Sequence, residues 1–219
     1  MENKALQIGD KAPHFEAMTT LGPFKLSDWK GKWIVFFSHP GDFTPVCTTE
    51  FIAFARMFPY FQQRNVQLLG LSVDSQYSHL AWIYNIYQMT GIEIPFPVIS
   101  DSTMSIAKKY GMISQAAGDT SPVRSVFIID DQQVIRGILT YPKTTGRNIP
   151  EILRMIDALQ TSDREKVVTP ANWTPSQWVI VPPPQTYPEL KERIENPKGY
   201  CCQEWYLCTR PLSLPSQGE

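Results

Sequence analysis

The sequence predicts an α/β fold in which a central sheet carries helices on both faces. Short, β-prone apolar runs alternate along the chain with longer segments whose apolar residues are spaced as on a helix. Two further apolar runs, joined by the turn residues 130–133, and a clearly amphipathic segment then close this region. After Lys166 prolines become frequent. We therefore expect a domain of residues 1–166 and a C-terminal domain or arm of residues 167–219.

The expected strands are apolar runs bounded by turn residues. Gly22-Pro23 predicts a short hairpin between the first two of them, and the fourth ends at Asp74. In chain order, the expected strands are residues 15–19, 24–26, 33–37, 66–73, 96–99, 126–129, 134–139 and 178–181.

The expected helices have apolar residues three or four positions apart and a cap or a breaker at one end. Thr44 and Pro45 suit the start of the first helix, and Pro59 should kink or end it. Gly91 and Gly111 stop the next two. In chain order, the expected helices are residues 45–61, 76–90, 102–110, 149–159 and 188–195.

Aromatic residues within these elements are expected to form the core, by their spacing. The helix over residues 76–90 takes its helical spacing from Leu80, Ile83, Tyr84 and Tyr87. The aromatic residues expected in the core are Trp33, Phe36, Phe51, Phe54, Trp82 and Tyr84.

Composition and charge exclude some classes of protein. With 42% hydrophobic and 19% charged residues, the 219-residue chain has ordinary globular values. A net charge of −1 without a basic block does not indicate binding to nucleic acid or to an anionic membrane. Residues 1–10 lack the pattern of a signal peptide, and no run approaches the roughly 20 apolar residues that span a bilayer. We expect a cytoplasmic protein.

The four cysteines divide into one early residue, Cys47, and a terminal cluster of Cys201, Cys202 and Cys208. In a reducing compartment, thiols in this arrangement are catalytic, redox-active or metal-binding more often than they form a structural disulfide framework. The cluster could bind zinc, but the paired C-x2-C spacing and a fourth ligand are missing, so we expect no metal.

Cys47 lies in the first turn of the helix that follows the strand over residues 33–37. A thiol there faces unpaired backbone N–H groups and the positive end of the helix dipole, which favour the reactive thiolate. The alternative is that Cys47 is a small buried apolar residue at a helix start. The cysteine alone does not decide between the two.

The neighbours of Cys47 add a resemblance. Pro40-x-x-x-Thr44-x-x-Cys47 resembles the active-site signature of peroxiredoxins, and residues 39–50 are most similar to their long 1-Cys-type subfamily, which has a C-terminal extension. The resemblance implies a thioredoxin-like fold without a cofactor. It also implies an enzyme that reduces hydrogen peroxide and organic hydroperoxides, oxidising Cys47 to a sulfenic acid.

The same resemblance implies roles for residues around Cys47. Thr44 would bind the peroxide, or simply cap the helix, and Pro40 would shield the thiolate. Arg124, before the strand over residues 126–129, would stabilise the thiolate and the transition state, unless it is an ordinary surface arginine. The further residues implied are His39 as a pocket residue, Arg147 as a second arginine and Glu50 as the carboxylate that orients an arginine. His39 could equally be structural, and His14 and His79 have no motif around them.

The tail has a second motif. Cys202 and Cys208 have a C-x5-C spacing around Trp205 and Tyr206 that is similar to archaeal-type members of the long subfamily, which are thioredoxin peroxidases. By this resemblance Cys208 resolves oxidised Cys47 across subunits, and Cys202 then exchanges into the disulfide. Cys201 has no assigned role.

The family resemblance and the edge strand over residues 134–139 together imply dimers, and decamers of five dimers. Residues 29–33 lack the serine of a lipase-like G-x-S-x-G, so we expect no phospholipase activity. Two other functions use the same fold: a redox sensor or oxidation-triggered chaperone that uses Cys47 as a switch, and a binding module in which Cys47 is inert.

Overall fold

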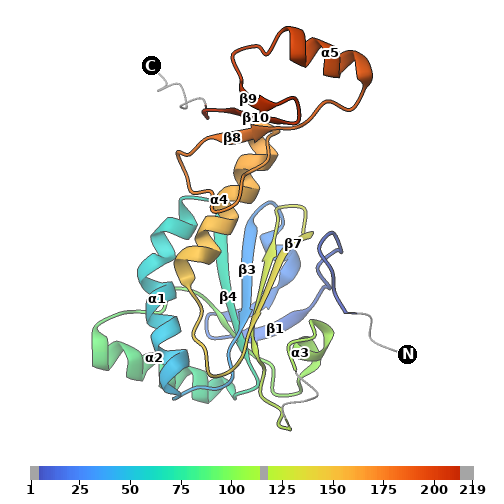
Figure 1. Cartoon of the computed structure of the whole chain (residues 1–219). Helices are drawn as coiled ribbons and strands as arrows, with labels where there is room; N and C mark the ends of the chain where they lie inside the picture. Colours follow the sequence, from blue (N-terminus) through green and yellow to red (C-terminus); the bar gives the residue numbers. More distant parts are fainter. Residues whose placement is uncertain (1–4, 114–117, 213–219) are drawn as a thin grey trace. The chain divides into compact units, whose positions relative to one another are not determined.

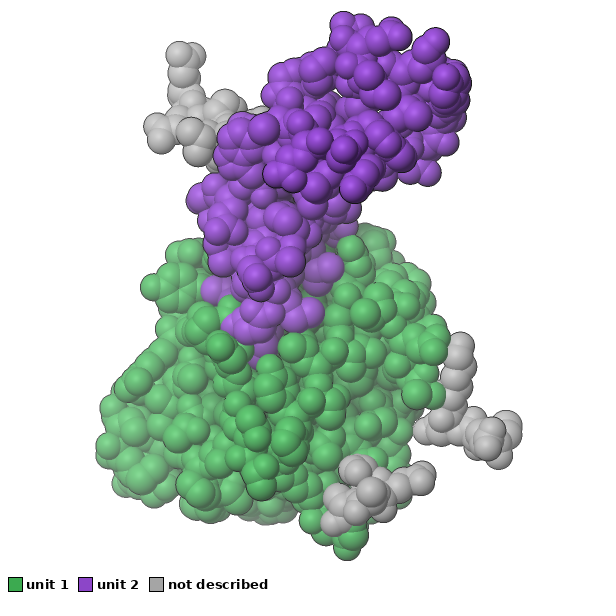
Figure 2. All heavy atoms as spheres, viewed as in Figure 1, with its two compact units in different colours: residues 1–150 green, residues 151–219 purple. Residues whose placement is uncertain are grey.

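The computed structural model describes residues 5–113 and 118–212, which divide between Pro150 and Glu151 into two compact units (Figure 2). Each unit is described by itself below. The division lies near the start of a long helix, α4 (Ile149–Glu165). The domain limit that we expect after residue 166 stays a prediction.

In its described residues, the first unit contains a seven-stranded sheet with the order β2-β1-β5-β4-β3-β6-β7 (Figure 1). Strands β3, β4 and β5 are parallel, and the outer neighbours pair antiparallel. The strands are β1 (Glu16–Thr19), β2 (Gly22–Lys25), β3 (Trp33–Ser38), β4 (Val66–Ser72), β5 (Val98–Ser100), β6 (Arg124–Ile129) and β7 (Ile135–Tyr141).

Helices cover both faces of this sheet, as the sequence predicts. Neighbouring residues of β3 show it directly, because successive side chains of a strand point to opposite faces. The Phe36 ring meets Tyr110, which follows α3, at 4.9 Å, whereas the Phe37 ring stacks on Phe54 of α1 at 4.3 Å. The helices of this unit are η1 (Leu26–Trp29), α1 (Pro45–Gln62), α2 (Gln76–Thr90) and α3 (Ser105–Lys109).

The ends of two helices differ from the expected ones. Helix α1 continues through Pro59 to Gln62, so of the two outcomes expected at Pro59, a kink or an end, the helix does not end there. Helix α3 begins only at Ser105, because Met104 has a left-handed backbone with φ of 60°. The Asp101 carboxylate accepts hydrogen bonds from the backbone N–H groups of Ser105, Ile106 and Ala107. It thereby pairs N–H groups of the first turn that have no partner within the helix.

Helix α2 turns a different face to the core from the one that the sequence indicates. Tyr84 is 60% exposed, so it is not a core residue, and Leu80 and Tyr87 are also exposed. The buried residues are His79, Trp82 and Ile86. The apolar pattern failed here because a polar residue, His79, occupies a buried position of the helix. The other five aromatic residues expected in the core are buried.

The second unit contains a small three-stranded sheet with the order β8-β10-β9 in its described residues. Val167, Trp173 and Val179 form a buried cluster beside it. The hairpin made by the last two strands was not expected from the sequence. Besides α4, the elements are β8 (Val179–Val181), α5 (Tyr187–Glu195), β9 (Cys201–Glu204) and β10 (Leu207–Arg210).

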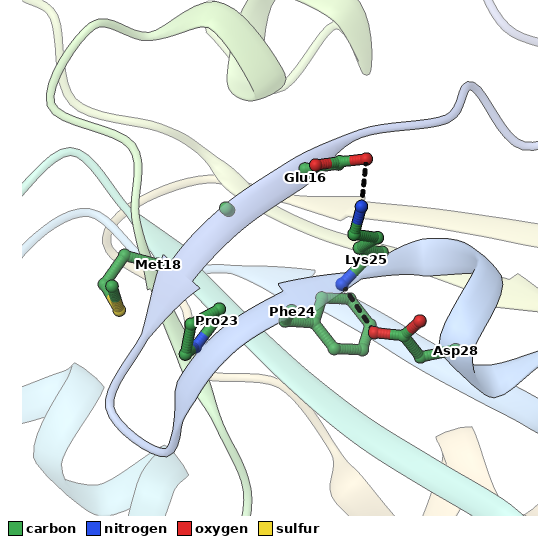
Figure 3. Close-up of a pocket in the computed structure, with 7 residues that line it drawn as sticks. Glu16, Met18, Pro23, Phe24, Lys25 and Asp28 are labelled. Carbon is green, nitrogen blue, oxygen red and sulfur yellow. Dashed lines mark hydrogen bonds and ion pairs between the residues drawn. The ribbon is translucent and has the colours of Figure 1, made fainter.

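Two further findings concern the surface. A hollow beside the β1–β2 hairpin is lined by residues that include Met18, Pro23 and Phe24, and an ion pair joins Lys25 Nζ to Glu16 at 2.8 Å (Figure 3). None of the residues expected in the site lines it. Within the described residues, no helix combines the length and the apolarity that crossing a bilayer requires.

Candidate active site

Cys47 lies in the first turn of α1, directly after the loop that leaves β3, and its side chain is fully buried. Thr44 is the N-cap residue and Pro45 the first helical residue, as expected. The Thr44 hydroxyl, however, does not cap the helix: it donates a hydrogen bond to the Gly41 carbonyl oxygen at 2.9 Å. Its proton is therefore used, and its oxygen remains an acceptor.

Arg124 at the start of β6 reaches the sulfur of Cys47. Its Nη1 lies 3.3 Å from Cys47 Sγ and donates to Glu50 Oε2 at 2.8 Å. Its Nε and Nη2 both donate to the Lys143 carbonyl oxygen, at 3.0 and 2.8 Å, which fixes the plane of the guanidinium. Arg124 is only 2% exposed, so it is not a surface arginine at a strand end.

Glu50, one turn after Cys47, binds both arginines of the site. Its Oε1 accepts from the backbone N and the Nε of Arg147, and its Oε2 accepts from Arg147 Nη2 at 2.6 Å as well as from Arg124. Arg147 Nη1 also donates to the carbonyl oxygens of Ser38 and Ser125. Burial alone would raise the pKa of Glu50, but the charge and hydrogen bonds of Arg147 and the charge of Arg124 outweigh it and lower that pKa.

The charges of this buried group explain why a thiolate fits it. Arg124, Arg147 and Glu50 together carry one net positive charge, and all three are less than 10% exposed. A buried charge is costly unless an opposite charge compensates it. A thiolate at Cys47, in contact with Arg124, would bring the sum to zero.

His39 is fully buried in the loop that carries Pro40, and it belongs to a second polar cluster. Its Nε2 lies 2.9 Å from Asp42 Oδ1, while its Nδ1 has no hydrogen-bond partner among the described residues. Burial lowers the pKa of His39, so its ring is neutral and carries its proton on Nε2. Asp42 also binds His79, whose Nδ1 lies 2.8 Å from Asp42 Oδ2.

His79 is a residue that sequence reasoning missed. Its two ring nitrogens face only acceptors, the Asp42 carboxylate and the Ile99 carbonyl oxygen at 3.1 Å. Burial would raise the pKa of Asp42, but the hydrogen bonds from His39 and His79 outweigh it and lower that pKa, so Asp42 is ionised.

The same three side chains are the group in the described chain that comes nearest to a metal site. The possible ligand atoms of His39, Asp42 and His79 lie within 4.8 Å of one another. These atoms already pair through the hydrogen bonds described above. The cluster also shapes the loop before Cys47, because the backbone N–H of Asp42 donates to Asp74 at 3.1 Å.

The tail cysteines belong to the second unit. Cys202 and Cys208 face each other across the β9–β10 hairpin and form a disulfide. Cys201 is a free, exposed cysteine, whereas Cys47 is a free, buried one. The sequence indicated the C-x5-C motif but not the hairpin that pairs its two ends.

Comparison with known proteins agrees with the fold and with this arrangement. A family model described as the AhpC/TSA family matches residues 8–138, and a model of the C-terminal domain of 1-Cys peroxiredoxin matches residues 158–196. The chain belongs to the peroxiredoxin family. It is therefore a thiol peroxidase with a thioredoxin-like fold, as the sequence predicts.

Individual peroxiredoxins resemble the chain over nearly its whole length. It is 66% identical over 206 residues to peroxiredoxin 2 of Caldanaerobacter subterraneus subsp. tengcongensis, with 94% of this chain and 93% of that protein covered. It is 54% identical to a peroxiredoxin of Aquifex aeolicus, with coverages of 94% and 97%. Among solved structures, yeast mitochondrial 1-Cys peroxiredoxin matches with a TM-score of 0.84 at 44% identity, covering 94% of this chain and 99% of that one.

Proposed function

We propose that this peroxiredoxin reduces hydrogen peroxide and small organic hydroperoxides through Cys47. The observation that carries the proposal is the 3.3 Å contact between Arg124 Nη1 and Cys47 Sγ in a buried helix start. The thiolate attacks one peroxide oxygen and the O–O bond breaks. The sulfur becomes Cys47–S–OH, and the second oxygen leaves as an alkoxide or hydroxide that takes up a proton. A positive donor fixed beside the sulfur stabilises the negative charge that moves during this step.

Thr44 would orient the peroxide as a hydrogen-bond acceptor. Its hydroxyl proton is bound to Gly41 O, so the peroxide O–H would donate to Thr44 Oγ1. Arg124 would donate a hydrogen bond to the same peroxide. Because Thr44 accepts and Arg124 donates, the two residues would bind different ends of the peroxide. Arg147 and Glu50 would hold Arg124 in place, and Pro40 and His39 would shape the loop on the other side. Hydrogen bonds support these roles for Thr44, Arg124, Glu50, Arg147 and His39, whereas the role of Pro40 rests on its place in the sequence motif.

For recycling, we propose that Cys208 of a second subunit attacks Cys47–S–OH and releases water. The disulfide that links Cys47 to Cys208 would then be opened by Cys202, which returns Cys47 as a thiol and leaves Cys202 bonded to Cys208. The Cys202–Cys208 disulfide of the present structure supports this product. An external thiol reductant of the thioredoxin type would reduce it; the related yeast structure concerns thiol resolution by glutathione and thioredoxin systems in that protein.

Assembly is part of this proposal. β7 is the outermost strand of the large sheet on one side in the described chain, which supports pairing of two subunits along this edge. Dimers joined in this way, and decamers of five dimers, would bring a second subunit's tail within reach of Cys47. The cytoplasmic location, expected because the sequence lacks a signal-peptide pattern and a bilayer-spanning apolar run, stays a prediction.

The experiment that tests the function measures peroxide consumption by the reduced protein with thioredoxin as reductant. Turnover over many equivalents of peroxide supports the peroxidase. A single, slow oxidation of Cys47 without turnover would instead favour the redox sensor or oxidation-triggered chaperone. Mass spectrometry of the peroxide-treated Cys202→Ser variant tests recycling, because a link between Cys47 and Cys208 should accumulate when Cys202 is absent. Sedimentation as a monomer at micromolar concentration would contradict the proposed assembly.

A further inference from the structure

The two sulfurs of the Cys202–Cys208 disulfide lie in different surroundings. Cys202 is on β9, an outer strand of the small sheet, and is an exposed residue. Cys208 is on β10, which is paired on both sides, with Val181 of β8 and with Cys202 of β9, and it is fully buried. The bond therefore joins an outer strand to a middle strand.

This difference decides from which side a thiol can attack. In thiol–disulfide exchange the incoming thiolate approaches along the S–S axis, opposite the sulfur that leaves. Attack on Cys202 needs approach from the side of the exposed outer strand. Attack on Cys208 needs approach from the side of β8, where Val181, its cross-strand neighbour, is itself buried. Access depends on the folded, disulfide-bonded hairpin, because the two cysteines are chemically equivalent in an unfolded chain. In the reduced tail, Cys208 must leave this buried position before it attacks Cys47–S–OH.

The surroundings of Cys208 suit the protonated thiol that forms after the disulfide has opened. Its Sγ lies 3.5 Å from the Glu204 carbonyl oxygen and 3.8 Å from that of Trp205. A disulfide sulfur has no proton to donate to these oxygens, but a thiol does. Once the bond opens and the released sulfur is protonated, Cys208 finds acceptors already in place.

We propose that Cys202 is the sulfur that the external reductant attacks and that Cys208 is the leaving thiol. The proposal rests on the recycling proposed above and adds which of the two sulfurs the reductant attacks. The reductant thiolate bonds to Cys202 Sγ, the Cys202–Cys208 bond breaks, and the Cys208 thiolate takes up a proton. A second thiol of the reductant then attacks the mixed disulfide. It releases Cys202 as a thiol and leaves the reductant as its own disulfide, so two electrons and two protons pass to the tail.

Cys201 does not take part in this step. Successive side chains of a strand point to opposite faces, so the Cys201 thiol lies on the face away from Cys202 Sγ. Its cross-strand neighbour is Thr209. Cys201→Ser therefore provides a background in which an adduct on this strand can only belong to Cys202.

The test maps the mixed disulfide in the oxidised Cys201→Ser protein. The probe is a thioredoxin whose second active-site cysteine has been changed to serine, so that the adduct cannot resolve; reduced glutathione serves as a small-thiol comparison. After quenching with acid, chymotrypsin cuts between the two cysteines at Trp205, Tyr206 or Leu207 and separates them. Mass spectrometry then measures the adduct on each peptide. The same reaction in denaturant is the matched control.

We expect the adduct on Cys202 to exceed that on Cys208 by about tenfold or more in the folded protein, and the two to approach parity in denaturant. An adduct mainly on Cys208, or a ratio that denaturant does not change, would overturn the inference. Peroxide consumption by the same protein with dithiothreitol is measured separately. If that consumption is absent, the proposed function fails while the adduct map still decides the direction of attack.

Discussion

Replacing Arg124 with alanine tests the contact on which the proposed chemistry depends most. At 3.3 Å from Cys47 Sγ, a unit charge at an effective dielectric constant of about 20 contributes about 5 kcal/mol to a thiolate. Glu50 binds the same Nη1 at 2.8 Å and offsets part of this. A smaller value, about 3–4 kcal/mol, is therefore the better estimate, and it matches the loss of one oxyanion donor elsewhere. We expect kcat/KM for peroxide to fall by about 10²–10³-fold.

The assay is stopped-flow peroxide consumption, together with the pH dependence of Cys47 alkylation as a measure of thiolate. Arg124→Lys is the matched control, since it keeps the charge but cannot reproduce the planar pair of hydrogen bonds to Lys143 O. It should lose less activity than Arg124→Ala. A double variant with Glu50→Gln should recover part of the loss, because it removes a negative charge near the thiolate and leaves the positive charge of Arg147 to compensate it. Rates for Arg124→Ala within about threefold of the unchanged protein, with the same alkylation profile, would refute the reasoning.

Three further outcomes are expected. Cys47→Ser should abolish peroxide consumption while near-UV circular dichroism stays unchanged; a residual rate above a few per cent, on the order of what a second thiol could supply, would contradict the assignment. Glu50→Gln should lower the free energy of unfolding by about 3–5 kcal/mol in urea titrations at pH 7, because Arg147 loses its buried counter-charge. The folded-state pKa of Glu50 lies below its usual 4.5, so its contribution to stability is present above pH 4.5 and is lost as the pH falls. The free energy of unfolding of the variant should therefore fall less steeply with acid than that of the unchanged protein. Equal slopes of unfolding free energy against pH would argue against this ion pair. His79→Ala should destabilise by about 1–3 kcal/mol, since Asp42 keeps only one imidazole partner, and an unchanged midpoint would show that the cluster is dispensable.

The sequence predicts what is local in this fold and misses what depends on distant partners. Cys47, Thr44 and Pro45 follow from a strand, turn and helix within a dozen residues, and Arg124 from its place before a buried strand. His79 could not be found in this way, because its partner Asp42 lies 37 residues away and no motif surrounds it. A buried histidine also interrupts the apolar pattern on the core face of α2. For this reason the pattern predicts Tyr84 in the core, although Tyr84 is exposed.

The tail shows the same limit. Cys202 and Cys208 are six residues apart, and their spacing alone does not reveal that β8 pairs with β10 and makes it the middle strand of a sheet. The partner strand lies more than 20 residues earlier, beyond a helix and several prolines. Burial of one cysteine and exposure of the other follow from this long-range pairing. Only the structure can therefore distinguish the two sulfurs.

Trp82 makes the first turn of α1 visible to spectroscopy. Its indole Nε1 donates to Thr48 Oγ1 at 3.2 Å, one residue after Cys47, and its ring stacks on His39 at 5.2 Å between ring centres. It is 1% exposed, so its emission should be blue-shifted relative to that of the exposed Trp178 and Trp205. Any rearrangement that lifts Cys47 out of this turn must break the indole hydrogen bond and change the polarity around the ring. The protein thus contains a buried tryptophan that is hydrogen-bonded to the residue after its reactive cysteine, and a change in its emission would report such a rearrangement without a label.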